Sequence, residues 1–396
     1  MTSGKHGAAA AALGYAYQTE WCLVELLRRA PDQPDLAISL ELHDDVAWEK
    51  AGSPTELLQL KHKIKSSGAL TDQHDDLWST IRVWMNTGRP LDAYGPRLTL
   101  VTTATAAAGS ATALLRDTVA RDPGKAAQRL REAAVLSSSR STADVRRRFA
   151  GLTDVERAVF VDRVYVLDGA TPIHDLDAEL RRLLWSVLPL GQEETFLALL
   201  GRWWHGLALD MLRSQRASVA VSDAKDMISD IRDQFHADNL PTLVELSDVD
   251  EDAVLEVHGD RPFVAQLRWV DYASGNLRRA IIDYYRAVVQ ETEWLDRDLI
   301  GLAELSRFEE NLRDEWGRAF DDMIDDLGAD ADETTKVAAG KALLRRLLDS
   351  TAVTVRARYN GPFFARGKRH GLADLGDLGW HPDFRARVSG LLSVAT

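Results

Sequence analysis

The chain has 396 residues, more than one ordinary hydrophobic core covers, so we expect two or three domains. Its 45% hydrophobic and 28% charged residues are typical of a folded soluble protein. The formal net charge of -13 argues against indiscriminate coating of nucleic acid, but it permits a local basic groove. No apolar run approaches the roughly 20 residues that cross a bilayer, and the N-terminal segment does not resemble a secretory signal. We therefore expect a cytoplasmic protein without membrane association.

The first hundred residues predict an α/β arrangement. Apolar positions at helical spacing predict a helix over residues 11–29. After a proline-rich break, alternating apolar residues predict three strands, at residues 36–44, 44–50 and 56–64. A second helix over 72–86 and a β-rich run over 97–105, with no charge past its first residue, follow. The order helix, hairpin, helix, strand is typical of a sheet with at least one face covered by helices.

The remainder of the chain predicts mainly helices. Residues 107–235 are mostly helical in pattern, apart from a short strand signal at 164–168. Periodicity is lost in the acidic segment 236–252, which we interpret as a domain boundary. Long amphipathic helices are predicted at 276–295 and 302–325. We divide the chain into an α/β core (1–110), a helical extension of it (111–240) and a mostly α-helical C-terminal domain (241–396).

One hairpin gathers the side chains that carry the strongest chemical signal. Asp45 opens the second strand, and Gln59 and Lys61 lie in the third. Because strand residues two positions apart share a face, Gln59 and Lys61 point the same way, and the hairpin turn can bring Asp45 to them. Mg²⁺, or Mn²⁺ in its place, prefers oxygen ligands, which Asp45, the Gln59 side chain and the carbonyl of Leu60 can supply. Lys61 can then orient the attacking water and offset phosphate charge, so the set suits phosphodiester cleavage.

Other charged residues flank this hairpin. Glu41 precedes Asp45 by four residues, and Glu20 lies on the first helix; either could hold a second metal ion. Lys63 and Lys65 add positive charge that would help a nucleic acid strand approach. The alternative interpretation is an ordinary solvated hairpin, in which lysines protect an exposed strand edge.

Five segments strengthen the catalytic interpretation, because together they resemble the double-stranded DNA endonuclease domain of bacterial anti-phage (CBASS) effectors. These segments are GYAYQTE, LELHDDVAWE, LLQLKHK, DDLWSTIRVW and LVTTATAAAGS. The resemblance covers about residues 10–235 and implies a restriction-endonuclease-like fold of the PD-(D/E)xK superfamily, with a mixed sheet flanked by helices. By position, Asp45, Gln59 and Lys61 match the catalytic residues of its QxK motif, and Glu41 matches the acid that precedes them.

The same resemblance extends these assignments to further residues. Glu20 matches an accessory acid by its helix position alone, and it is expected beside Asp45, Gln59 and Leu60 as a metal ligand. Residues expected to contact the nucleic acid are Lys63, Lys65 and Arg82.

The C-terminal part resembles a different family, the C-terminal domains of three-component ABC-ATPase defence systems. The resemblance spans about residues 245–390 and is most specific in RGKRHGLAD and GWHPDF. It implies docking to partner subunits, including a separately encoded ATPase. The chain itself lacks a GxxxxGK[ST] motif and is not expected to hydrolyse ATP.

Residues 356–370 combine basic and aromatic side chains and allow two interpretations. Such interleaving can bind nucleic acid phosphates, and it can equally form an interface with an acidic protein. The basic residues concerned are Arg356, Arg358, Arg366, Lys368 and Arg369. In the following segment, hydrogen bonds that structure a loop are expected rather than a metal site for His370, Asp374, Asp377 and His381.

These observations predict a Mg²⁺-dependent endodeoxyribonuclease that serves as an effector of anti-phage defence. It is expected to cut double-stranded DNA as a homo-oligomer and to be regulated through partner subunits. The rival prediction is a catalytically inactive adaptor that scaffolds a multi-component defence complex. RNA as the substrate also stays open, since metal-assisted phosphodiester chemistry does not by itself distinguish the two sugars.

Overall fold

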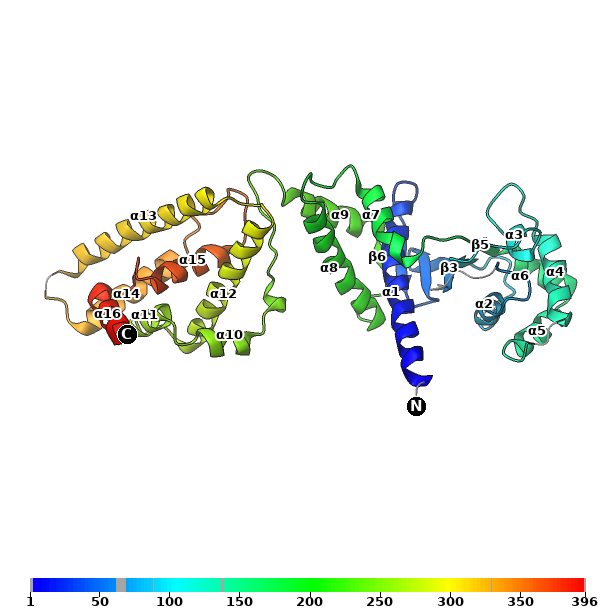
Figure 1. The fold of residues 1–396 in the computed structure, drawn as a ribbon, viewed down its shortest axis with the longest axis horizontal. Coiled ribbons are helices and arrows are strands. Elements are labelled where there is room, and N and C mark those ends of the chain that lie inside the picture. Colours follow the sequence, from blue (N-terminus) through cyan, green and yellow to red (C-terminus); the bar gives the residue numbers. More distant parts are fainter. Residues whose placement is uncertain (1–2, 62–68, 88, 137–138, 329, 395–396) are drawn as a thin grey trace. The chain divides into compact units, whose positions relative to one another are not determined.

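The computed structural model describes residues 3–61, 69–87, 89–136, 139–328 and 330–394. Contacts within the chain divide it into two compact units, Met1–Ser229 (unit 1) and Asp230–Thr396 (unit 2). Figure 1 shows a sheet with helices in the first unit and helices throughout the second. The finer division of the chain at residues 110 and 240 stays a prediction.

Unit 1 is built on a six-stranded mixed sheet with the order β5-β4-β3-β2-β1-β6. Strands β1, β2 and β3 pair antiparallel, β3, β4 and β5 pair parallel, and β6 adds antiparallel to β1. The strands are β1 (Ala37–Leu40), β2 (Val46–Lys50), β3 (Ser53–Lys61), β4 (Arg97–Thr102), β5 (Val164–Leu167) and β6 (Val219–Ala220).

The register of the β2–β3 hairpin is set by its turn and by a β-bulge. Ala51 and Gly52 form the tip with φ values of 51° and 77°, a conformation that matches the twist of two-residue hairpins. The turn pairs Lys50 with Ser53, and a register shift between Trp48 and Glu49 then brings Val46 opposite Leu58. This register places the residue before β2 next to the C-terminal half of β3, which is where the predicted site lies.

Helices cover both faces of the sheet, each over its own apolar core. On one face Leu58 and Leu60 pack with α1 and α8, in a cluster that includes Trp21 and Trp204. On the other face Leu57 packs with α2 and with helices α4 to α6. Figure 1 shows these two groups on opposite sides of the strands. The helices of unit 1 are α1 (Ser3–Arg29), α2 (Asp75–Met85), α3 (Ala111–Leu114), α4 (Pro123–Leu136), α5 (Ala143–Ala150), α6 (Asp154–Asp162), η1 (Ile173–Asp175), α7 (Leu176–Leu184), α8 (Glu193–Leu212) and α9 (Val221–Asp233).

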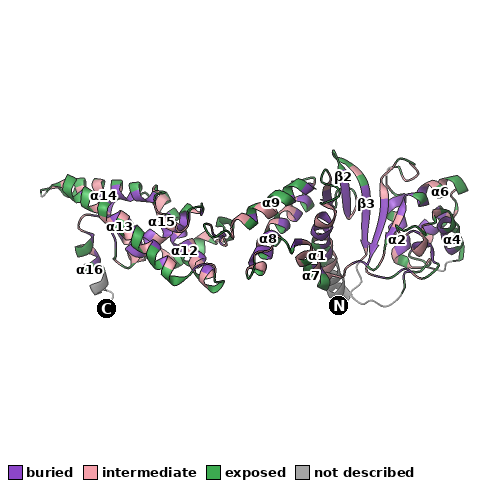
Figure 2. Ribbon diagram, turned by 90° about the horizontal axis from the view of Figure 1, so that it is seen from above, coloured by how far each residue is buried: buried purple, intermediate pink, exposed green. Residues whose placement is uncertain are grey.

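The described residues of unit 2 form helices joined by loops, and they enclose one large aromatic core. Trp294, Trp316 and Trp380 are buried in it, and Figure 2 shows the buried faces of its helices turned inward. Helices α12 and α15 approach closely at Gly367, where an added Cβ would lie 2.5 Å from the Cβ of Ala287. The elements are η2 (Leu246–Asp248), α10 (Glu251–His258), α11 (Pro262–Trp269), α12 (Ser274–Asp296), α13 (Leu302–Leu327), α14 (Glu333–Leu348), α15 (Pro362–Asp374) and α16 (Phe384–Val394).

The predicted fold class is confirmed at the level of a mixed α/β N-terminal half and a helical C-terminal part. The strand β6 was missed, because two residues are too short to show alternation. Among the described residues, no helix combines the length and apolar character needed to cross a membrane.

Candidate active site

The hairpin brings Asp45 against the end of β3. Asp45 directly precedes β2, and its carboxylate Oδ2 accepts a hydrogen bond from the backbone N–H of Leu60 at 2.9 Å. Asp45 also closes the β1–β2 turn, since its carbonyl accepts a 3.2 Å hydrogen bond from the N–H of Glu41. The acid is thereby fixed beside the strand that carries the glutamine and the lysine.

Gln59 and Lys61 share the face of β3 that α2 covers. Leu57 belongs to the core beneath α2, whereas Leu58 and Leu60 belong to the core beneath α1. Alternation along the strand therefore directs Gln59 and Lys61 toward the α2 side. Asp45 reaches the same face by alternation from Ala47 of β2, which also packs in the α2 core. The structure thus brings Asp45, Gln59 and Lys61 to one face of the sheet.

Gln59 is the least expected member of this set, because it is buried with an unsatisfied oxygen. Its side chain is only 4% exposed, and within the described part of the chain its Oε1 has no hydrogen-bond partner. A buried acceptor without a partner costs free energy unless water or an ion satisfies it. The Gln59 Oε1 atom is therefore available to coordinate an ion or to accept a hydrogen bond from water.

Asp44 is a residue that sequence reasoning missed. Its Oδ1 accepts a 3.0 Å hydrogen bond from the N–H of Asp45, and its Oδ2 accepts one of 2.9 Å from the indole N–H of Trp84 on α2. Burial raises the pKa of Asp44 to about 7, although these hydrogen bonds and the nearby ammonium of Lys61 oppose the shift. The doubled acid was visible in the sequence, but the pattern could not show that both acids face the site.

Glu41 lies at the edge of this cluster. It is exposed and adopts a left-handed conformation with φ of 55°. Partial desolvation raises the pKa of its carboxyl, and the charge of Asp45 raises it further. A nearby cation would relieve the repulsion between these two acids.

Further unsatisfied polar atoms lie on the α2 side of the sheet. Glu49 is 3% exposed, and its Oε1 lies 3.5 Å from the imidazole of His43 without a hydrogen-bond partner among the described residues. On β1 and α2, the hydroxyls of Ser39 and Thr80 are buried without a partner in the portion of the chain that is described. A buried polar surface of this kind is usually completed by water or ions.

Two predicted residues within the described part of the chain, Glu20 and Arg82, have other surroundings. Glu20 lies on α1, which covers the opposite face; it lines a groove with α7 and α8, where desolvation and then Asp177 raise its pKa. Arg82 bonds to the carbonyl of Ser141 and, at 2.8 Å, to the carboxylate of Asp144. Lys63 and Lys65 lie outside the described residues.

The donor set fits a hard divalent cation. Asp45 keeps Oδ1 available after Oδ2 has accepted the Leu60 N–H, and Gln59 offers its unsatisfied Oε1. Carboxylate and amide oxygens are ligands that Mg²⁺ and Mn²⁺ accept, and no thiolate or imidazole competes for them in the set.

The basic residues of 356–370 are occupied within unit 2, so neither interpretation drawn from the sequence is supported. Each one meets an acidic side chain, and Tyr359, Phe363 and Phe364 are buried in the core. The pairs are Arg356 with Glu304, Arg358 with Asp233 and Asp238, Arg366 with Asp283, Lys368 with Glu291 and Glu309, and Arg369 with Glu315.

The acidic residues that follow this stretch also form ion pairs within unit 2. Asp374 pairs with Arg261, and Asp377 pairs with Arg313. His381 lies close to two acids, Glu333 and Asp383, but these acids pair at 2.6 and 3.0 Å with Arg387 and Lys336. Their charge is thereby neutralised without a metal ion.

Comparison with known proteins identifies part of unit 2. No curated protein and no solved structure matches the chain. Residues 263–388, which lie entirely within unit 2, match the family model of C-terminal domain 7 of the ABC-three component (ABC-3C) systems. This match supports a place for the chain in a defence system of that kind.

Proposed function

We propose that unit 1 is a metal-dependent DNA endonuclease and that the chain is a nuclease effector of an ABC-3C defence system. The observation that carries this proposal is the unsatisfied, buried Gln59 Oε1 on the same sheet face as Asp45 and Lys61. The mixed sheet with helices on both faces also agrees with the restriction-endonuclease-like fold that the sequence resemblance implies.

Asp45 and Gln59 would hold the cation, together with the carbonyl of Leu60. When bound, such a cation supplies positive charge that polarises the phosphate oxygens. Lys61 contributes a second positive charge beside the phosphate and can orient the attacking water. Glu41 would act as an accessory acid at the edge of the site. Glu20 has no part in this arrangement, because α1 carries it to the opposite face.

Unit 2 would connect the nuclease to its system. The ABC-3C match suggests that other subunits bind this unit, and a separately encoded ATPase is the expected partner. Regulation would then pass through subunit binding. The match is equally expected of an inactive adaptor, so nuclease activity itself has to be measured.

The direct test is cleavage of supercoiled plasmid by the full chain with Mg²⁺ or Mn²⁺, with and without EDTA. Lys61→Gln should slow cleavage by about 100-fold or more, because it removes a charge that acts in the transition state. Lys50→Gln is the matched control: Lys50 is exposed on the same hairpin, and its loss should leave the rate unchanged. A single-stranded RNA substrate in parallel shows which nucleic acid is preferred.

Metal binding gives a readout that does not depend on an activating partner. Titration calorimetry with Mn²⁺ should detect a site in the wild-type chain that Asp45→Asn removes. Asp35→Asn is the control, since Asp35 is exposed and lies before β1. Absence of both cleavage and Mn²⁺ binding in the wild type would favour the adaptor.

A further inference from the structure

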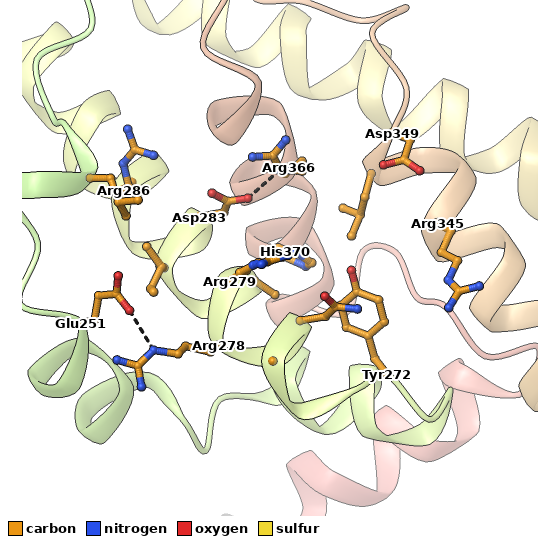
Figure 3. A pocket seen from close by; sticks show the side chains of 16 residues that line it. Glu251, Tyr272, Arg278, Arg279, Asp283, Arg286, Arg345, Asp349, Arg366 and His370 are labelled. Atoms are coloured by element: carbon orange, nitrogen blue, oxygen red, sulfur yellow. Dashed lines mark hydrogen bonds and ion pairs between the residues drawn. The ribbon is translucent and has the colours of Figure 1, made fainter.

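Unit 2 contains a cavity of about 830 Å³ whose lining is rich in arginine. Figure 3 shows the arginines reaching it from three helices: Arg278, Arg279 and Arg286 from α12, Arg345 from α14 and Arg366 from α15. They outnumber the acids of the lining, Glu251, Asp283 and Asp349. Since acidic residues exceed basic ones in unit 2 as a whole, this cavity concentrates positive charge against the trend of its domain.

Two of these arginines have no competing partner. Arg278 pairs with Glu251 and Asp252, and Arg366 pairs with Asp283 at 2.6 Å. Arg279 and Arg345 are exposed, and no ion pair or hydrogen bond engages their guanidinium groups among the described residues. Both groups are therefore available to an anion.

The start of α12 adds backbone donors to the same cavity. Gly275 and Asn276, in its first turn, belong to the lining. The N-cap residue is Ala273, which provides no side-chain hydrogen bond to the helix. The N–H of Asn276 donates to the carbonyl of Ala273 at 2.8 Å, whereas the N–H groups of Ser274 and Gly275 have no side-chain cap. The partial positive charge at the start of this 23-residue helix favours an anion.

Two rings complete the lining. His370 is 1% exposed, and its Nδ1 is buried without a hydrogen-bond partner in the described structure. Tyr272 is half-buried and offers an aromatic surface beside the arginines (Figure 3). A cavity of this volume is in the range of small-molecule sites, which join a few convergent polar groups to apolar or aromatic walls.

We propose that this cavity binds a small phosphorylated ligand, with Arg279, Arg345 and the N-terminus of α12 holding its phosphate groups. Planar guanidinium groups bind phosphate oxygens in pairs, and helix N-terminal N–H groups bind them through fixed donors. The volume leaves room for an organic group, such as a nucleoside, against Tyr272. This inference does not depend on the nuclease proposal.

The test is titration calorimetry of the full chain with pyrophosphate, ADP, adenosine and tetraglutamate. EDTA is present throughout, so that no metal ion can bridge a phosphate to the acids of unit 1. Pyrophosphate and ADP should bind, and adenosine and tetraglutamate should bind at least about tenfold more weakly, because the site is built for phosphate. Equal affinities for pyrophosphate and ADP would show that only phosphate is read, and tighter binding of ADP would show that the nucleoside is read as well.

Variants locate the site. The double variant Arg279→Gln and Arg345→Gln should weaken pyrophosphate binding by about tenfold or more, since it removes two charged donors. The control, Arg307→Gln with Arg318→Gln, removes two charges from exposed positions of α13 and should change affinity less than about twofold. The proposal is overturned if no phosphate probe binds at millimolar concentration, if tetraglutamate binds as tightly as pyrophosphate, or if the two double variants behave alike.

Discussion

Two sets of buried polar side chains, one in each unit, differ in whether an opposite charge faces them. In the core of unit 2, Arg369 has no exposed surface and its Nη2 meets Glu315, while its Nε and Nη1 have no hydrogen-bond partner among the described residues. Lys368 lies between Glu291 and Glu309. On the α2 face of unit 1, by contrast, the Gln59 oxygen faces no opposite charge and has no hydrogen-bond partner in the part of the chain that is described. Paired charges make a scaffold rigid, whereas a buried neutral acceptor without a partner, such as Gln59 Oε1, is a place where a ligand can complete the structure. The comparison teaches that a charged stretch whose charges are paired internally does not by itself indicate a site.

The largest effect is expected when one partner of a buried ion pair in unit 2 is removed. Arg369→Ala should lower the free energy of unfolding of unit 2 by about 3–5 kcal/mol, because Glu315 loses its buried counterion. Urea unfolding followed by circular dichroism measures the loss. Replacing both partners, Arg369→Met with Glu315→Leu, should recover part of it, since no unpaired charge remains. A loss below about 1 kcal/mol in Arg369→Ala would contradict the scaffold role.

A second prediction concerns packing in the same scaffold. Gly367→Ala should destabilise unit 2 by about 1–3 kcal/mol, because the new Cβ would collide with the backbone oxygen of Asp283 and the Cβ of Ala287. Gly317 of α13 is the matched control, since nothing lies within 4 Å of a Cβ added there. Gly317→Ala should stabilise the helix by about 0.5–1 kcal/mol. The same unfolding measurement checks both, and equal signs would refute the close approach of α12 and α15.

A third prediction sharpens the comparison on the side of unit 1. Asp44 titrates near 3.8 when unfolded, and burial raises its folded pKa to about 7. The folded state therefore holds this proton more tightly than the unfolded state does. Protonation of Asp44 stabilises the fold fully below the unfolded pKa, and this contribution to the free energy of unfolding is lost as the pH rises through about 7. Between pH 4 and pH 8, the wild type should lose about 1–2 kcal/mol more than Asp44→Asn, a figure reduced for the access of water.

Unfolding curves of the wild type and Asp44→Asn at several pH values check this prediction. Parallel pH profiles would mean that Asp44 ionises normally in the folded protein. Repeating the wild-type series with Mn²⁺ extends the test, because a cation bound beside Asp44 should favour its charged form and flatten the pH dependence.

These cases show which parts of the molecule the sequence could predict. Alternation along β2 and β3 predicted the hairpin, and with it the shared face of Gln59 and Lys61. Helical spacing predicted α1 but could not say which sheet face it covers, so Glu20 was expected beside Asp45. The ion pairs of the basic stretch were invisible, because Arg366 and its partner Asp283 are separated by 83 positions along the chain. Local patterns predict elements, whereas pairings between distant residues require the fold.

The smallest predicted effect comes from the same basic stretch and isolates burial from charge. Arg358 is exposed and lies 3.7 Å from Asp233 and 4.0 Å from Asp238. Arg358→Gln should therefore change the free energy of unfolding by less than about 0.5 kcal/mol, and added salt should reduce even that effect. Arg369 lies eleven residues further along, and its removal is predicted to cost several times more. Equal losses in the two variants would mean that net charge, and not burial of the pair, determines what this stretch contributes to unit 2.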